Sequence, residues 1–201
     1  MIITKASPKR KGLTALYIDG EYALDVDTET LLSSRFTVGS ELDDDELLEL
    51  VEASGEKRAK ERALWLISYR DHSRRELLDK LKKTSGERHS ERAVERMEEL
   101  GLVDDRKYAE RYARELINVK HLSVRAAMYK LSQKGIDREL SESILEELDP
   151  DPREHIAAVI EKKYRNSLSD EKARRRAVAA LQRMGYGWSD ISAVLEEYES
   201  D

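Results

Sequence analysis

Cysteine is absent from this 201-residue chain, and proline, glycine and aromatic residues are scarce. Without cysteine there is no disulfide scaffold, no thiolate metal site and no cysteine nucleophile. Three prolines and nine glycines exclude collagen and most low-complexity disordered classes. No stretch approaches the roughly 18 uncharged apolar residues of a membrane-spanning helix. The first five residues also lack the order of a signal peptide. We therefore expect a soluble, cytoplasmic, helix-rich protein.

Charge, in contrast, is abundant and unevenly distributed. Charged residues make up 39% of the chain, and the net charge is −6. Residues 1–53 carry five basic and twelve acidic side chains, whereas residues 54–103 carry thirteen basic and ten acidic ones. The acidic total argues against a protein that coats nucleic acid through bulk electrostatics. A local basic stripe can still meet a polyanion.

Two β-prone runs, Leu13–Ile18 and Glu21–Val26, flank the pair Asp19-Gly20. Such a pair is typical of a tight hairpin turn, because both central residues of that turn need a positive φ. A lone hairpin is only marginally stable in water, so we expect a third strand near Ile2–Lys5 or a supporting helix. We interpret the basic run Lys9–Lys11 as a solvated loop, with phosphate contact as the alternative.

From about residue 43 the apolar pattern becomes helical and repeats itself. The acidic run Asp43–Glu46 has the form of a helix start. Beyond it, apolar positions recur at a period of about fifty residues, which indicates tandem structural repeats. The aligned positions are Leu77, Leu78 and Leu81, then Ala127, Met128 and Leu131, then Ala177, Val178 and Leu181, and in the following helix Met97, Leu145 and Leu195.

Each repeat is predicted to contain three short helices, which in the first repeat cover residues 61–70, 74–83 and 91–100. Ser73-x-x-Glu76 is a capping box at the start of the second helix. Gly101, Gly135 and Gly185 each precede an apolar residue, which is the signature of a Schellman helix end. Asp104 or Asp105 then caps the next helix, whose inner face carries Tyr108, Tyr112 and Leu116.

The fold class predicted from these patterns is mainly α. Three helices of about eleven residues bury little surface alone, so stability must come from stacking the repeats side by side. We expect tandem three-helix repeats forming an elongated curved solenoid, preceded by a small N-terminal β-hairpin segment. The predicted parts are a hairpin plus helix at residues 1–53 and three repeats at residues 54–103, 104–149 and 150–201.

The motifs that usually carry catalysis or cofactor binding are missing. The sequence has no P-loop, and Gly185-Tyr186-Gly187 lies between predicted helices with no strand before it, so it indicates a helix end rather than a dinucleotide loop. Paired carboxylates such as Asp104-Asp105 are interpreted as helix caps. We therefore expect no catalytic, cofactor-binding or metal-binding residues, no cofactor and no enzymatic activity.

We also interpret the histidines and the aromatic residues as structural rather than as metal ligands or base-stacking groups. The histidines lie far apart without metal-ligand spacing, so we expect them on the solvent-exposed surface; a metal site would require them to converge across repeats. The aromatic residues could stack on nucleic-acid bases, but their helical spacing favours the core. The residues concerned are His72, His89, His121 and His155, and Trp65, Tyr69, Tyr108 and Tyr112.

One feature suggests a binding role. The fifty-residue period that aligns the core also aligns Arg75, Arg125 and Arg175. A stripe that recurs once per repeat suits a partner that is itself periodic. The alternative is that these arginines pair with acidic residues of neighbouring helices or cover apolar surface with their stems. The full set of candidate partner-binding or DNA-binding residues is Arg74, Arg75, Lys82, Lys83, Arg125, Lys130, Lys134, Arg174, Arg175 and Arg176.

Several motifs together resemble the signature of the bacterial RecX family of recombination regulators. The matching residues are Ser73-x-x-Glu76-Leu77-x-x-Lys80-Leu81, Glu99-Leu100-Gly101-Leu102-Val103-Asp104-Asp105-x-x-Tyr108-Ala109, Lys134-Gly135-Ile136 and Ile18-Asp19-Gly20-Glu21-Tyr22. The resemblance covers essentially the whole chain in order and spacing. The third repeat is the least typical, since Arg174-Arg175-Arg176 replaces the usual mixed sequence there.

The resemblance implies a non-enzymatic modulator of the recombinase RecA. Proteins of this family are expected to lie in the groove of the RecA–single-strand DNA filament, and thereby to reduce ATP hydrolysis, strand exchange and coprotease activity in homologous recombination, DNA repair and the SOS response. The implied partner is the RecA nucleoprotein filament, with a secondary contact to single-stranded DNA left open, no membrane contact and a monomeric state. Two other hypotheses are a protein that binds nucleic acid directly and a generic α-solenoid adaptor for another protein.

Overall fold

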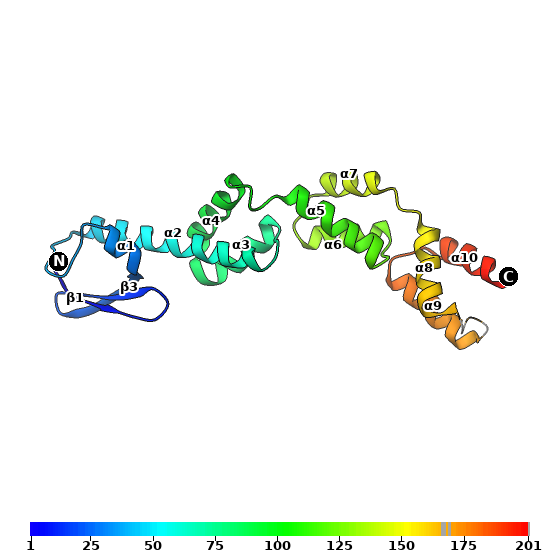
Figure 1. The fold of residues 1–201 in the computed structure, drawn as a ribbon, viewed down its shortest axis with the longest axis horizontal. Helices are drawn as coiled ribbons and strands as arrows, with labels where there is room; N and C mark the ends of the chain where they lie inside the picture. Colours follow the sequence, from blue (N-terminus) through cyan, green and yellow to red (C-terminus); the bar gives the residue numbers. More distant parts are fainter. Residues whose placement is uncertain (166–167, 169, 201) are drawn as a thin grey trace. The chain divides into compact units, whose positions relative to one another are not determined.

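The computed structural model describes residues 1–165, 168 and 170–200. Its contacts divide the chain into two compact units, residues 1–103 and residues 104–201. Figure 1 traces the elements along the chain, from the N-terminal sheet to the C-terminal helix. Each unit is described by itself below.

The N-terminus of the first unit forms a three-stranded antiparallel sheet of order β1-β2-β3. Its strands are β1 (Ile3–Pro8), β2 (Leu13–Ile18) and β3 (Glu21–Asp27). At the turn between β2 and β3, Asp19 has φ 51° and Gly20 has φ 92°. Both central residues therefore have the positive φ that a tight hairpin turn requires, which confirms the predicted hairpin. The predicted third strand is β1.

Two helices, α1 (Thr28–Ser33) and α2 (Asp44–Tyr69), cover this sheet. Asp43 caps α2 by accepting a hydrogen bond from the Glu46 amide, and the Glu46 side chain accepts from the Asp43 amide in return. The predicted helix start is thus a complete capping box. Burial of one face of the sheet supplies the core, which consists of Ile3, Leu16, Val26, Leu31, Leu42 and Leu50.

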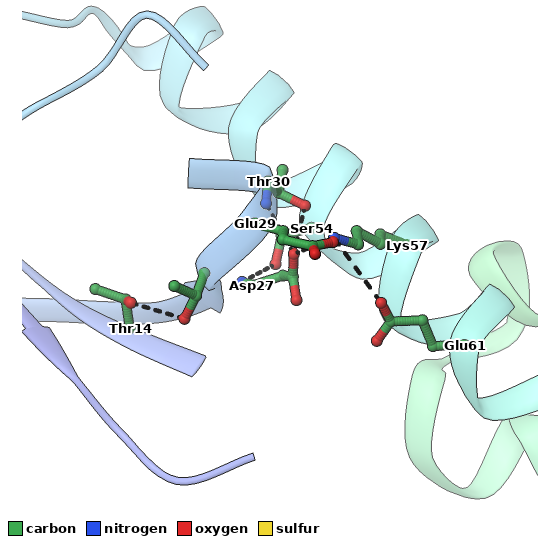
Figure 2. A network of polar contacts seen from close by, with 8 residues as sticks. Thr14, Asp27, Glu29, Thr30, Ser54, Lys57 and Glu61 are labelled. Carbon is green, nitrogen blue, oxygen red and sulfur yellow. Dashed lines mark hydrogen bonds and ion pairs between the residues drawn. The ribbon is translucent and has the colours of Figure 1, made fainter. Parts of the chain in front are cut away.

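A polar network joins the sheet to the middle of α2 (Figure 2). Asp27 caps α1, its amide donates to Ser54 Oγ at 2.7 Å, and its carboxylate lies 3.1 Å from Lys57 Nζ. Burial opposes ionisation of Asp27, but hydrogen bonds from Thr30 and the contact with Lys57 outweigh it and hold its pKa below the usual value. Lys57 also pairs with Glu29 and Glu61. The end of β3 is therefore anchored to α2.

Helix α2 is continuous where the sequence suggested two helices. The predicted first helix of repeat 1, residues 61–70, is the second half of α2, and the predicted boundary after residue 53 falls inside the helix. Gly55 does not interrupt it. A Cβ at Gly55 would lie only 2.5 Å from Nε2 of His89, so this glycine makes room for the imidazole ring of a packed helix.

Helices α3 (Arg74–Ser85) and α4 (Glu87–Glu99) complete the first repeat. They pack with the second half of α2 around a core formed by Ala59, Ala63, Leu66, Leu77, Leu81, Ala93, Val94, Met97 and Val103. Arg88 and Arg92 of α4 pair with Glu52 and Glu56 of α2. Helices α2 and α4 are thus held together by apolar packing and by flanking ion pairs.

The second unit contains two further three-helix groups. The first has α5 (Asp105–Arg114), which continues into a π-helical turn η1 (Glu115–Val119), followed by α6 (Val124–Gln133) and α7 (Arg138–Leu148). The second has α8 (Pro152–Lys163), α9 (Glu171–Arg183) and α10 (Trp188–Ser200). Each group has a core cluster of its own. The mainly helical class with tandem three-helix repeats is confirmed, and the elongated, curved arrangement stays a prediction.

The burial pattern repeats with the predicted period. The corresponding residues Leu77 and Leu81, Ala127 and Leu131, and Ala177 and Leu181 are all fully buried. Gly101, Gly135 and Gly185 have φ values of 67°, 81° and 96°, as the predicted Schellman ends require. Ile136 and Tyr186 fold back into the core after their glycines. After Gly101, however, Val103 is buried and Leu102 stays 44% exposed.

Across residues 1–165, 168 and 170–200, no helix combines the length and the apolar character needed to cross a bilayer.

Candidate partner-binding surface

The candidate surface is built on the second helix of each repeat, α3, α6 and α9. Ser73, Ser123 and Asp170 cap these helices, each accepting a hydrogen bond from the amide three residues later at 3.0 to 3.2 Å. Satisfying these first-turn amides fixes where each helix begins. The three helices therefore start from equivalent caps, although α9 begins earlier relative to its buried residues.

The periodic arginines lie on the exposed side of these helices. Arg75, Arg125 and Arg175 each stand two residues before a fully buried position, Leu77, Ala127 and Ala177. Two residues correspond to about 200° around an α-helix, so the arginine and the buried residue project in nearly opposite directions. All three arginines are exposed. The period of the core thus determines the exposure of the arginines.

Their contacts are local. Arg75 lies 3.9 Å from Asp79, and Arg175 pairs with Glu171, in both cases within one helix and between exposed side chains. Arg125 forms no ion pair with a carboxylate in the described part of the chain. Exposed pairs four residues apart on one helix contribute only about 0.3–0.5 kcal/mol, so a partner can displace them at little cost.

The other candidates in the first unit flank Arg75 on α3. Arg74 pairs with Glu98 of α4 at 3.1 Å, and Lys82 pairs with Glu87 at 2.7 Å. Lys83 is exposed near the C-terminal end of α3. Here Arg74 and Lys82 help hold α3 against α4, whereas Arg75 and Lys83 project into solvent.

The remaining candidates belong to the second unit. Lys130 is exposed on α6, and Lys134 lies 6.0 Å from the ring centre of Tyr112, so it covers an aromatic face. On α9, Arg176 is exposed, whereas Arg174 is partly buried and interacts with another group of the chain. The structure thus places the ten predicted residues on α3, α6 and α9 or directly after α6.

Within the second unit, the start of α6 meets the end of α9. The Ser123 amide donates to the Met184 carbonyl at 3.0 Å, and the Tyr186 hydroxyl donates to the His121 carbonyl at 2.8 Å. Burial raises the pKa of Tyr186 to about 12. Beside this junction lies a pocket of about 330 Å³ lined in part by Arg125, His155, Tyr186 and Asp190. Arg125 is therefore next to the junction, while Arg175 stands near the far end of α9.

The expectation that the histidines are surface residues is wrong. His72 is 4% exposed, and its Nε2 lies 2.8 Å from Lys80 Nζ. His121 and His155 converge from two repeats, with their Nδ1 atoms 3.2 Å apart. Burial, and then the charges of His155, Lys162 and Lys163, lower the pKa of His121. Repeat stacking created this proximity, which linear spacing could not reveal.

The core interpretation of the aromatic residues is correct for one pair and wrong for the other. Tyr108 is buried and Tyr112 is half-buried, as expected. Trp65 is 50% exposed and Tyr69 is 78% exposed. The face of α2 that enters the core carries Ala59, Ala63 and Leu66 instead, and Leu64 is 46% exposed. The small alanines allow α3 and α4 to approach α2 closely, and a pattern of large apolar residues does not indicate such a face.

The potential metal ligands in the described ranges of the chain are histidine, aspartate and glutamate side chains. No group of three or more histidine, aspartate or glutamate side chains is arranged there to hold a metal ion. The His121–His155 pair alone supplies two nitrogen ligands, fewer than the three or four of protein zinc sites.

Comparison with known proteins gives a consistent result over the whole chain. Three family models match in order: "RecX, first three-helix domain" at residues 59–97, the second three-helix domain at residues 104–145 and the third at residues 151–195. These ranges lie within the three predicted repeats.

Relatives and solved structures agree with the family models. A protein named Regulatory protein RecX from Clostridium acetobutylicum is 33% identical, covering 99% of this chain and 97% of the relative. One of the same name from Bacillus subtilis is 30% identical over 99% of this chain and 78% of its own length. A crystal structure of regulatory protein RecX matches with a TM-score of 0.63 and 26% identity, over 97% of this chain and 98% of that one. RecX from Lactobacillus salivarius matches with a TM-score of 0.61 and 25% identity, over 74% of this chain and 99% of that one.

Proposed function

Because the chain belongs to the RecX family of regulatory proteins, we propose that it regulates the recombinase RecA in the cytoplasm without itself being an enzyme. It binds along the groove of the RecA–single-strand DNA filament and limits filament growth or stability. Reduced ATP hydrolysis, strand exchange and coprotease activity of RecA follow from this binding.

The observation that carries the proposal is the ordered match of all three domains within a full-length similarity to proteins named Regulatory protein RecX. A filament presents the same surface at regular intervals, so a protein built from repeats can meet it with repeated contacts. The arginines at Arg75, Arg125 and Arg175 provide one exposed cation in each repeat. They suit a periodic partner that carries negative charge.

The local pairing of these arginines supports a binding role more than a structural one. Arg75 and Arg175 pair only with exposed carboxylates of their own helices, and Arg125 borders a pocket. Replacing such weak pairs with contacts to a partner costs little stability. In contrast, Arg74 and Lys82 join two helices, so their loss would also affect the fold.

The test is the rate of ATP hydrolysis by RecA on single-stranded DNA as this protein is added. We expect the rate to fall while the protein is still substoichiometric to RecA, because one regulator in the groove affects a filament of many protomers. A heat-denatured sample of the same protein serves as the control. A hydrolysis rate that stays constant up to equimolar protein would contradict the proposal.

A further inference from the structure

The exposed face of α2 in the first unit carries an aromatic pair that the core does not use. The rings of Trp65 and Tyr69 lie 5.2 Å apart between centroids and are tilted by 47°. The guanidinium carbon of Arg62 lies 4.2 Å from the centre of the Trp65 ring. Trp65 is 50% exposed and Tyr69 is 78% exposed, so neither ring is buried in the unit.

The helical period places two arginines on the same side of α2. Arg58, Arg62, Trp65 and Tyr69 are separated by four, three and four residues, so they form one stripe about 17 Å long. The buried residues Ala59, Ala63 and Leu66 each follow a stripe residue by one position, so they lie about 100° around the helix from the stripe. The stripe therefore lies beside the face that enters the core, and all four of its residues are exposed.

The two arginines of the stripe differ from their neighbours in their contacts. Arg70, Arg74, Arg88, Arg92 and Arg96 are each paired with a carboxylate. Neither Arg58 nor Arg62 forms an ion pair with a carboxylate among the residues that the structure describes. Two exposed cations thus retain their capacity to bind an anion.

The loop between β1 and β2 extends this basic surface. Gly12 in that loop accepts a hydrogen bond from the Thr28 amide at 2.8 Å, next to the Asp27–Ser54 contact that anchors β3 to α2 (Figure 2). Lys9 pairs with Asp25 at 2.9 Å. The pKa of Asp25 is lowered chiefly by Lys9 and to a smaller degree by Arg58, which places Asp25 within the field of both cations. The exposed Arg10 and Lys11 follow in the same loop.

We propose that the first unit binds single-stranded nucleic acid along this stripe, with Trp65 and Tyr69 stacking on bases and Arg58, Arg62 and the loop residues Arg10 and Lys11 contacting phosphates. Sites for single strands combine a cationic track with exposed aromatic rings, because every base offers a π-face. The planar guanidinium of Arg62, which lies over Trp65, offers a further flat surface on which a base can stack. A duplex, whose bases are already stacked, offers no such partner to the rings.

The chemistry of the stripe favours a single strand over a protein. Protein interfaces are also enriched in aromatic residues and arginine, so the preference for a single strand comes from the further cations Arg10 and Lys11, which extend the stripe into a basic track. In this stripe, cations and rings share one narrow helix face, and neither arginine forms an ion pair with a carboxylate among the described residues, although Asp25 lies within the field of Arg58. A polyanion with exposed rings satisfies both sets of groups at once.

The first experiment locates the contact by fluorescence. The chain has two tryptophans, so Trp188→Phe leaves Trp65 as the only reporter. We expect saturable quenching of Trp65 when oligothymidine or oligouridine of about 20 nucleotides is added at low salt. The two oligonucleotides show whether the site distinguishes DNA from RNA. The reciprocal variant Trp65→Phe reports from Trp188, which is also exposed but lies outside the stripe, and its emission should not change.

The second experiment measures affinity by anisotropy of a labelled oligonucleotide. Trp65→Ala should weaken binding about tenfold, whereas Trp188→Ala should leave it unchanged. Arg58→Ala combined with Arg62→Ala removes two phosphate contacts and should make the slope of log affinity against log salt shallower by about 1.4. The matched control is Arg138→Ala with Arg153→Ala, which removes two exposed arginines outside the stripe.

Both experiments use bare oligonucleotides without RecA, so their failure is separate from failure of the proposed regulation. Absence of binding by the unmodified protein at low salt would overturn the proposal. Binding that survives Trp65→Ala and the arginine pair would assign the strand to another surface and overturn it too. Loss of RecA regulation in Trp65→Ala without any strand binding would identify the stripe as a protein-docking surface instead.

Discussion

His72 shows how one buried side chain couples the first unit to pH. Its Nδ1 lies 2.8 Å from the Arg70 carbonyl, and its Nε2 lies 2.8 Å from Lys80 Nζ. Since an ammonium group can only donate, Nε2 accepts and the proton is on Nδ1. Burial, followed by the charges of Arg70 and Lys80, lowers the pKa of His72 below its ordinary value of 6.5.

This environment predicts acid sensitivity in a defined pH range. A base with a depressed folded-state pKa binds fewer protons when folded, so the unfolding free energy should fall as pH drops below about 6.5. The carboxylates with lowered pKa values act only at more acidic pH. The measurement is the midpoint of urea unfolding at pH 7.5 and at pH 5.5. Trp65 emission in the Trp188→Phe background is the signal that reports unfolding of the first unit. His72→Gln should reduce the difference between the two midpoints, and an unchanged difference would contradict this role.

Gly185 is a second residue with a local structural role, because the absence of a side chain there allows two helices to pack closely. It has φ 96°, and an added Cβ would overlap Ser123 Oγ and lie 2.9 Å from the Cβ of Ala126. Ser123 Oγ cannot simply move away, because it caps α6. The glycine thus permits both the end of α9 and its close approach to α6.

We expect Gly185→Ala to lower the unfolding free energy of the second unit. Holding a non-glycine residue in the left-handed backbone region alone costs about 1–3 kcal/mol, and the overlap with α6 should add to this loss. Gly101→Ala is the control, since Gly101 has φ 67° but nothing near an added Cβ. Denaturant titration should show the larger loss for Gly185→Ala. Equal losses would mean that the contact with α6 contributes nothing beyond backbone strain.

At the scale of elements, equivalent helices present equivalent arginines. In α3, α6 and α9, the buried positions are at the same distance after Arg75, Arg125 and Arg175, so the three cations share one geometry relative to the core. Their contacts within the chain are weak or local. Reversing the charge of these arginines should therefore weaken binding to a partner more than it lowers the stability of the fold.

A triple variant in which Arg75, Arg125 and Arg175 are all changed to Glu should bind RecA filaments more weakly, and its melting temperature should be nearly unchanged. Each lost charged contact at a partly desolvated interface costs on the order of 1–3 kcal/mol, which is easily measured in a titration. The control with the same change in charge replaces Arg106, Arg138 and Arg153, three exposed arginines in first turns of α5, α7 and α8. A large fall in melting temperature would point to a structural role, and normal binding with a normal melt to a solvated face.

For the whole molecule, the repeat period has consequences for shape. Stacked repeats bury surface only against their neighbours, so the chain should be more extended than a sphere of the same length. A compact 201-residue globule has a radius of gyration of about 16–17 Å. Small-angle X-ray scattering should give a clearly larger value, and the compact value would contradict a solenoid.

The sequence alone determined the elements whose signals are local. The turn at Asp19-Gly20 and the caps at Asp43, Ser73 and Asp104 follow from short-range hydrogen bonds and backbone preference. The fifty-residue period identified the buried positions because each repeat solves the same packing problem. It also placed the periodic arginines on the exposed faces of their helices.

Tertiary structure decided everything that depends on neighbours in space. The sequence could not show that α2 is continuous, because Gly55 weakens a helix locally and only the ring of His89 packed against it explains the glycine. It could not show that His121 meets His155, which are 34 residues apart. It also placed Trp65 and Tyr69 in the core, because helical spacing identifies a face without saying which face is covered. Packing against α3 and α4 selected the alanine face of α2 and left the two rings in solvent.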